Sequence, residues 1–318
     1  MKAFLSEKYG PPDTLRLANV ETRPPNAAEI LVKIRAISVN PADWHCLRGK
    51  PVFSRVTLGL LKPNNTILGV DVAGDVEVVG RDVTEFTPGD AVFGNLLDHG
   101  FGGFAEYVSA PAAAFALKPR SVSFEEAAAV PMAGVTALQG LRQHGGVSAG
   151  KTVLVNGASG GVGHFAVQIA KAYGAVVTGV TSTRNVEFVR SLGADQVIDY
   201  TREDFTRTGR RWDHILDTIG NRSVTDLRHA LSSNGRCAVA GFTTTRNLLA
   251  VAARGGKQIT LLQAHSTAKD LDLLAELIDG NSMRPALERR YAFADLPDAI
   301  RYLETGRARG KVVVTHVA

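Results

Sequence analysis

The chain has 318 residues, of which 45% are hydrophobic and 21% are charged, and this length and composition indicate a packed globular protein of more than one domain. No apolar run approaches the roughly 20 residues that span a bilayer, and the first residues lack the apolar region of a secretion signal, so we expect a cytosolic protein without a membrane span. The formal net charge of +5 comes from scattered basic residues, a pattern that argues against nucleic-acid binding.

The N-terminal part of the chain is predicted to form short strands joined by turns. Residues 29–36 alternate between apolar and polar side chains, which is typical of a half-buried strand. Residues 68–80 are rich in valine and are interrupted by glycines, and a turn at 87–90 leads into a short strand at 91–93. These features predict a small, bent, barrel-like β-domain, to which residues 311–315 are expected to return as a strand.

From about residue 123 onwards, strands alternate with helices. A helix is predicted first, over residues 125–141. The elements predicted after it are a strand at 152–156, an amphipathic helix, a strand at 176–180, a helix at 185–192 that ends at Gly193, and strands at 196–199 and 214–217. This alternation predicts an α/β fold with a parallel, doubly wound sheet.

Residues 157–163, with the sequence GASGGVG, join the strand at 152–156 to the amphipathic helix. They match the dinucleotide-binding pattern G-x-G-x-x-G with Ala158 in the first glycine position, followed by Gly160 and Gly163. Gly160 would let the backbone approach a pyrophosphate, and Gly163 would let the helix pack closely on the strand. The amides at the start of the helix would point at the anion. The alternative is a tight turn without a ligand.

The end of the next strand selects the form of the nucleotide. NAD-binding sites place an acidic residue about twenty residues past the loop, on the ribose 2′-hydroxyl. Here the strand continues into Ser182 and Arg184, and no acidic residue occurs before Glu187. Ser182 can donate to a 2′-phosphate and Arg184 can pair with it, which favours NADPH, and Tyr200 is predicted on the same adenosine side. The alternative is that Arg184 is a surface residue at a helix start.

Several segments together carry a family resemblance over essentially the whole chain. They are SVNPADW (38–44), GVDVAG (69–74), FTPGD (86–90), GGFAEY (102–107), VPMAGVTA (130–137), the glycine loop and GKVV (310–313). In these segments the chain resembles the medium-chain dehydrogenase/reductase superfamily, in its quinone oxidoreductase branch. Residues 40–44 and 181–185 are most similar to the plastid-envelope quinone oxidoreductase-like and reticulon-interacting mitochondrial groups, which include reductases of quinones and α,β-unsaturated carbonyls.

The resemblance implies a GroES-like catalytic domain over residues 1–122, completed by 292–318, and a Rossmann domain over 123–291. It also implies that Asn40 and Trp44 line the nicotinamide and substrate side. With the residues argued above, the predicted cofactor-binding set is Thr136, Ser159, Gly160, Gly161, Val162, Thr181, Ser182, Arg184, Tyr200, Ile219, Ala240, Gly241 and Phe242. Two alternatives stay open: Asn40 as a turn-forming residue before a proline, and Trp44 as part of the core.

The sequence departs from the zinc alcohol dehydrogenases of the same superfamily. By resemblance, their catalytic-zinc ligands fall at Asn40, Val70 and Met132, none of which suits that site. The two cysteines, Cys46 and Cys237, lack a CxxC spacing, so a structural zinc site and a disulfide framework are not expected either. We therefore predict no metal. Asp43, His45 and Cys46 are close in sequence and could suggest a different metal site, but we interpret them as a strand-to-helix connection with exposed polar groups.

The expected activity is hydride transfer from NADPH to a quinone or an enone, because a conjugated acceptor delocalises the developing charge without a Lewis acid. Candidate donors to that charge are the Asn40 amide, a backbone N–H or the ribose hydroxyl of the cofactor. Two alternatives remain: an NADPH-binding sensor without turnover, and an alcohol dehydrogenase with an unconventional metal. Residues 258–262 resemble an edge strand through which relatives pair, so we expect a homodimer.

Overall fold

The computed structural model describes residues 1–143 and 146–316, and the chain divides into two compact units. The first unit comprises Met1–Met132, Ser266–Asp279 and Leu287–Ala318, and the second comprises Ala133–His265 and Gly280–Ala286. Both chain ends therefore contribute to the first unit. The last two positions of the predicted C-terminal stretch 292–318 lie outside the described residues.

The first unit contains a mixed sheet in the order β14-β15-β3-β4-β5-β7, with β6 paired to β3, and a separate hairpin of β1 and β2. Its strands are β1 (Lys2–Leu5), β2 (Arg16–Asn19), β3 (Glu29–Val39), β4 (Asp71–Val79), β5 (Ala91–Asn95), β6 (Tyr107–Pro111), β7 (Phe115–Leu117), β14 (Leu287–Ala292) and β15 (Lys311–Thr315). The alternating burial of β3 confirms the half-buried strand, and β15 pairs antiparallel with β3, as expected for a C-terminal strand that returns.

Helices close the first unit around an apolar core. They are α1 (Pro41–Arg48), α2 (Arg55–Leu58), α3 (Phe124–Ala128), α9 (Ala268–Asp279) and α10 (Leu296–Glu304). The unit extends to residue 132 rather than 122 because α3 packs on β3 and β4 and buries Ala127 and Ala128 there. Helix α9 belongs to this unit as well, because it packs on β7. The boundaries thus differ from those expected from the sequence.

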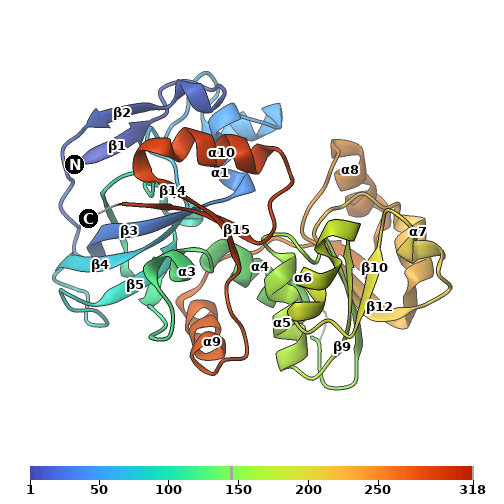
Figure 1. The fold of residues 1–318 in the computed structure, drawn as a ribbon. Coiled ribbons are helices and arrows are strands. Elements are labelled where there is room, and N and C mark those ends of the chain that lie inside the picture. Colours follow the sequence, from blue (N-terminus) through green and yellow to red (C-terminus); the bar gives the residue numbers. More distant parts are fainter. Residues whose placement is uncertain (144–145, 317–318) are drawn as a thin grey trace. The chain divides into compact units, whose positions relative to one another are not determined.

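The second unit is a parallel sheet in the order β10-β9-β8-β11-β12-β13. The strands are β8 (Thr152–Asn156), β9 (Val176–Thr181), β10 (Gln196–Asp199), β11 (Trp212–Asp217), β12 (Leu231–Val239) and β13 (Ile259–Leu261). The helices are α5 (Gly163–Ala172), α6 (Val186–Ser191), α7 (Val224–Ala230) and α8 (Thr245–Arg254). Figure 1 shows α5 and α6 on one face of the sheet and α7 and α8 on the other, which confirms the doubly wound α/β fold.

The helix predicted over residues 125–141 is in fact two helices, α3 and α4 (Pro131–Arg142). Proline lacks a backbone N–H and fits the first position of a helix, so Pro131 begins α4 and prevents the two from being continuous. Ser123 begins α3 by a capping box with Glu126: Glu126 N donates to Ser123 Oγ, and Ser123 N donates to the Glu126 carboxylate.

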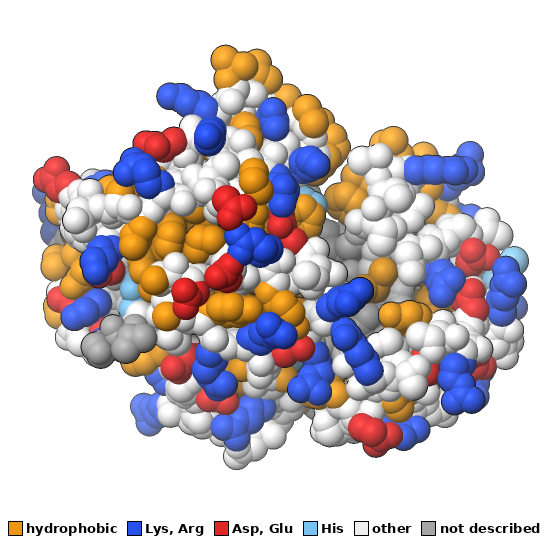
Figure 2. All heavy atoms as spheres, turned by 45° about the horizontal axis from the view of Figure 1, so that its top comes forward, with side chains coloured by type: hydrophobic (Ala, Val, Ile, Leu, Met, Phe, Trp, Pro, Cys, Tyr) orange, Lys and Arg blue, Asp and Glu red, His pale blue; other side chains and the backbone are white. Residues whose placement is uncertain are grey.

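Within residues 1–143 and 146–316, no helix is long and apolar enough to cross a membrane. On the face drawn in Figure 2, Lys and Arg side chains are spread among Asp and Glu side chains and do not form one continuous stripe.

Candidate functional site

A buried polar cluster lies where β3 ends and α1 begins. Asn40 occupies the N-cap position of α1, and its side chain is buried. Its Nδ2 donates to the Ser38 carbonyl (3.1 Å) and to Asp71 Oδ2 (2.9 Å), and its Oδ1 accepts a hydrogen bond from Lys311 Nζ (2.6 Å). Because Asp71 can only accept and Lys311 can only donate while both are charged, these partners fix which way the amide points.

Asp71 and Lys311 are the first residues of β4 and β15, and both are buried, with 3.7 Å between Lys311 Nζ and Asp71 Oδ2. Asp71 also accepts hydrogen bonds at Oδ1 from Asn95 Nδ2 (2.7 Å) and Met132 N (3.0 Å). Burial raises the pKa of Asp71 and lowers the pKa of Lys311, and each charge counteracts the shift of the other. The cluster is thus an internal ion pair with its remaining hydrogen bonds largely satisfied.

Asp43 adds a second carboxyl to this cluster. Its Oδ2 accepts a hydrogen bond from Asn40 N (2.7 Å), whereas its Oδ1 is buried and has no partner among the described residues. Burial raises the pKa of Asp43 to about 8, and the negative charge of Asp71 contributes in the same direction. Two acids and one ammonium share this buried space, so Asp43 holds a proton near neutral pH.

The structure places the two predicted catalytic residues on the same short segment. The Asn40 amide is engaged by Ser38, Asp71 and Lys311, as described above. Trp44 lies one turn along α1, is half-buried, stacks on His45 with 3.7 Å between ring centroids and packs against the core. The sequence analysis did not identify Lys311 or Asn95 as members of this cluster. The sequence did contain a signal for Lys311, because in KVVV (311–314) a charged residue begins an otherwise apolar strand.

The second unit gathers most of the predicted cofactor residues at one edge. In a parallel sheet the carboxyl ends of all strands meet at the same edge, and ligands bind where the strand order reverses, which here is between β8 and β11. The predicted residues that follow directly on the ends of β8, β9, β10, β11 and β12 are Ser159, Gly160, Gly161, Val162, Ser182, Arg184, Tyr200, Ile219, Ala240, Gly241 and Phe242, and Thr181 is the last residue of β9.

The glycine loop has the tight geometry that its sequence predicts. Gly157 has φ = 86°, and Gly160 N donates to the Gly157 carbonyl (3.0 Å), which closes the turn. A Cβ on Gly163 would lie 2.1 Å from that same carbonyl, so only glycine lets α5 begin so close to the strand. A Cβ on Gly160 would meet only the Gly157 carbonyl, at 3.3 Å. The side of Gly160 where a Cβ would stand is therefore nearly free of protein atoms.

Side chains tie this loop to the end of β9. Ser159 Oγ accepts hydrogen bonds from Thr181 Oγ1 (2.8 Å) and from Asn185 Nδ2 (3.1 Å). Thr181 and Asn185 are buried, whereas Ser159 is half-buried. The glycine loop and the segment that carries Ser182 are thus held in a fixed relation, and Asn185 is a contributor that the sequence analysis did not single out.

The region expected to hold a 2′-phosphate lies after β9. Ser182 is half-buried and Arg184 is exposed, in the 3₁₀ turn Thr183–Asn185 and the residue before it. Asp199, at the end of β10, is close by: its Oδ2 accepts from Thr183 Oγ1 (2.6 Å) and its Oδ1 from Thr201 Oγ1 (2.7 Å). These hydrogen bonds, Thr183 foremost, lower the pKa of Asp199 and keep it ionised.

The ends of β11 and β12 approach each other backbone to backbone. A Cβ on Gly220 would lie 2.0 Å from the Gly241 carbonyl, so the two loops pack without side chains between them. Asp217 Oδ1 accepts from Asn156 Nδ2 (2.8 Å), Ile219 N (3.0 Å) and Gly220 N (2.9 Å), and burial raises the pKa of this carboxyl. Ile219 and Phe242 remain exposed at this edge.

Thr136 lies outside these loops and strand ends. It is half-buried on α4, one turn before Gly140, which packs closely on Leu216 of β11.

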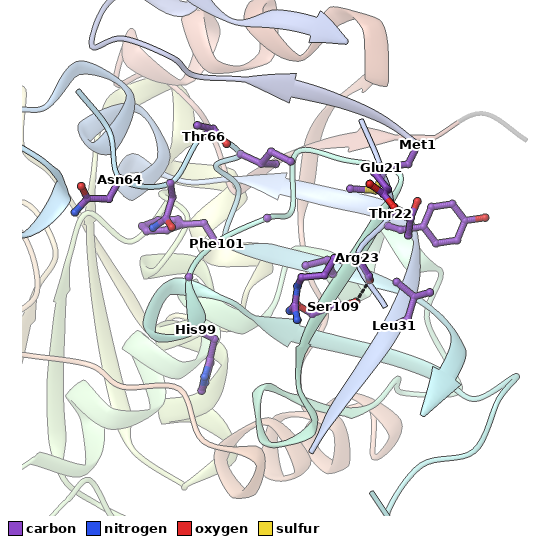
Figure 3. A pocket seen from close by; sticks show the side chains of 16 residues that line it. Met1, Glu21, Thr22, Arg23, Leu31, Asn64, Thr66, His99, Phe101 and Ser109 are labelled. Atoms are coloured by element: carbon purple, nitrogen blue, oxygen red, sulfur yellow. Dashed lines mark hydrogen bonds between the residues drawn. The ribbon is translucent and has the colours of Figure 1, made fainter. Parts of the chain in front are cut away.

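A separate cavity of about 360 Å³ lies in the first unit. Figure 3 shows side chains of its wall, among them Glu21, Arg23, His99 and Phe101, with Arg23 hydrogen-bonded to the Ser109 carbonyl (2.9 Å). None of the predicted site residues lines it. Within residues 1–143 and 146–316, no group of three or more His, Cys, Asp or Glu side chains is arranged to hold a metal ion.

Two family models match this chain, and the second of them spans parts of both compact units. The alcohol dehydrogenase GroES-like domain matches residues 26–120, and the zinc-binding dehydrogenase family matches residues 192–314. The 2-methylene-furan-3-one reductase of Solanum lycopersicum is 34% identical over 325 residues, covering 99% of this chain and 79% of that protein. The chloroplast envelope quinone oxidoreductase homolog of Arabidopsis thaliana is 33% identical over 304 residues, covering 91% of this chain and 90% of its own. The solved quinone oxidoreductase from Coxiella burnetii matches with a TM-score of 0.88 at 31% identity, over 100% of this chain and 99% of that one.

Proposed function

The chain belongs to the medium-chain dehydrogenase/reductase family, in its quinone oxidoreductase branch, and we propose that it transfers hydride from NADPH to quinones or α,β-unsaturated carbonyls without a metal ion. The observation that carries this proposal is the edge of the second sheet. There a glycine loop with an open side at Gly160, the N-terminus of α5 and the polar residues after β9 lie together. These groups fit the pyrophosphate and adenosine ribose of a dinucleotide.

The preference for NADPH rests on the residues after β9. No carboxylate ends that strand, and Ser182 and Arg184 follow it with a hydroxyl and a guanidinium that suit a phosphate. Asp199 is an acidic side chain at this place that would support NADH instead, because a carboxylate is the usual partner of a free 2′-hydroxyl. Its oxygens already accept from Thr183 and Thr201, which favours the phosphate form.

Independence from zinc is supported by the ammonium of Lys311. The residue at the position of the relatives' first zinc ligand, Asn40, accepts a hydrogen bond from Lys311 Nζ. A second cation beside a buried ammonium would be repelled strongly, because the interaction is poorly screened in the interior. Val70, at another of these positions, is a fully buried aliphatic residue. We therefore propose that this chain works without the zinc named in the description of the family model that matches residues 192–314.

When bound, NADPH supplies the hydride. The residues of this chain position the dinucleotide through the glycine loop and Ser182, and the charge that develops on a conjugated acceptor needs a hydrogen-bond donor. The Asn40 amide is occupied by three partners within its own unit. A backbone N–H or the ribose hydroxyl can therefore serve without breaking an existing bond, and water can supply the proton.

The test is the oxidation of NADPH by chelator-treated protein offered small quinones and enones, with NADH in parallel and metal content measured. We expect turnover that survives chelation and is faster with NADPH. Tight NADPH binding without turnover of any acceptor would instead favour the sensor alternative. About one zinc per chain, with activity lost on chelation, would favour an alcohol dehydrogenase with an unconventional metal.

A further inference from the structure

The loop 50–62 exposes an unusual number of large apolar side chains. It follows α1, includes the short helix α2 and leads towards β4, and it is drawn in light blue in Figure 1. Five of its side chains are between 61% and 89% exposed, namely Val52, Phe53, Val56, Leu60 and Leu61. Single exposed apolar residues are ordinary, but five within ten positions mark an interaction surface.

The loop is anchored from its inner side. Tyr9 Oη donates to the Gly59 carbonyl (2.6 Å), and the Arg55 guanidinium lies over the Tyr9 ring, 4.4 Å from its centroid. Arg55 Nε donates to the Gly49 carbonyl (3.1 Å), and Leu58 packs against the core of the first unit. These contacts hold the loop to its own unit while the five apolar side chains remain exposed.

The charge of this region has one sign. No acidic residue occurs from position 44 to position 70, whereas Lys50 and Lys62 bracket the apolar side chains. Both lysines are exposed, and neither forms an ion pair among the described residues. The other two cations of the region are held internally: Arg48 pairs with Glu304, and Arg55 lies against Tyr9.

From this combination we propose that the loop 50–62 docks the protein on the surface of a bilayer that contains anionic lipids. Leu60, Leu61 and Phe53 would enter the boundary between headgroups and acyl chains, and Lys50 and Lys62 would attract the anionic headgroups. An anionic bilayer offers negative charge and apolar depth together at any orientation, which suits exposed lysines on either side of a run of exposed apolar side chains. The docking surface needs no catalytic turnover, so it stands apart from the proposed reductase activity.

The experiment is co-sedimentation of the full chain with phosphatidylcholine vesicles, with and without phosphatidylglycerol. We expect binding to the anionic vesicles and little to the neutral ones, with a decrease as salt rises. The double variants Leu60→Ser/Leu61→Ser and Lys50→Glu/Lys62→Glu are each expected to weaken binding by at least about tenfold. Matched controls are Leu249→Ser and Lys257→Glu, exposed residues of the second unit, which should bind as the unmodified protein does.

Reduction of a water-soluble quinone without vesicles shows that each variant is folded, and it should be unchanged. The proposal is overturned if the unmodified protein ignores anionic vesicles, or if both loop variants bind as well as the controls. It is also overturned if Leu60→Ser/Leu61→Ser loses quinone turnover while keeping its vesicle binding, because the loop would then serve the substrate.

Discussion

Among the residues of the first unit, Lys311 is the one whose replacement we expect to lower the stability of the fold most. It holds Asn40 Oδ1 and balances Asp71 in a place without solvent. Lys311→Met would leave Asp71 as a buried, unpaired charge, so we expect the free energy of unfolding to fall by about 3 kcal/mol or more. Urea unfolding measures this, and the double variant Lys311→Met/Asp71→Asn should recover part of the loss. Equal stability of the single variant and the unmodified protein would contradict the ion pair.

Asp43 gives the protein a predictable dependence on pH. Its folded pKa of about 8 lies above its ordinary value of 3.8, so the folded state keeps a proton that the unfolded chain releases. Asp43 therefore makes folding less favourable as pH rises from about 4 to about 8, by up to about 1.4 kcal/mol per pH unit.

Asp43→Asn removes this contribution while keeping an acceptor for Asn40 N. Urea unfolding across that pH range should show a flatter profile for the variant than for the unmodified protein. Parallel profiles for the two proteins would mean that Asp43 is ionised in the folded state.

Arg184 should determine the choice between the two nucleotides. Arg184→Ala removes a charged partner of the 2′-phosphate, so we expect the KM for NADPH to rise about tenfold or more while the KM for NADH changes little. Arg190→Ala, an exposed arginine of α6, is the matched control. A similar change for both nucleotides would refute this role, and Asp199→Asn would then show whether the carboxylate binds the ribose instead.

At the level of elements, two glycines of the loop between β8 and α5 are expected to have different roles. Gly163 allows the helix to pack closely, and Gly160 leaves room for a ligand. Gly163→Ala places a Cβ 2.1 Å from the Gly157 carbonyl, so the helix must shift. We expect a loss of about 1–3 kcal/mol in the free energy of unfolding together with weaker NADPH binding.

Gly160→Ala tests NADPH binding separately from packing. Its Cβ meets only one atom, at 3.3 Å, so the fold should remain near normal while a methyl group occupies the side facing the expected pyrophosphate. Urea unfolding and NADPH fluorescence titration measure the two effects. If Gly160→Ala binds NADPH normally, the loop does not hold the pyrophosphate there.

The elements also show where local patterns are reliable. The period-two pattern at 29–36 and the strand–glycine–helix order at 152–163 predicted β3, β8 and α5, because each depends on neighbours along the chain. The helix expected at 125–141 was divided at Pro131, a stop that the sequence itself contained. Helix α8 was not predicted, although Thr244 caps its start locally by accepting a hydrogen bond from Asn247 N. The split of the first unit across three segments was not predicted because it depends on packing partners distant in sequence.

At the scale of the whole molecule, β13 (Ile259–Leu261) forms one edge of the second sheet, as its sequence had indicated. An edge strand with apolar residues is a template for pairing with another chain. We therefore predict a homodimer, measured by light scattering during size exclusion as twice the chain mass. A single species at the monomer mass across concentrations would rule this out. A cytosolic location likewise stays a prediction, for which cell fractionation is the measurement.

The sequence by itself determined what local spacing encodes: the glycine loop, the alternation that yields a parallel sheet, and the family to which the chain belongs. It also named most of the residues at the sheet edge where we propose that the nucleotide binds, because loops after parallel strands meet at one edge whatever the details of packing. Only the tertiary structure decided which side chains form hydrogen bonds with the Asn40 amide. Asp71 lies 31 positions and Lys311 lies 271 positions from it along the chain. No local pattern carries such distances, because the cost of burying these charges is offset only once folding has brought them together.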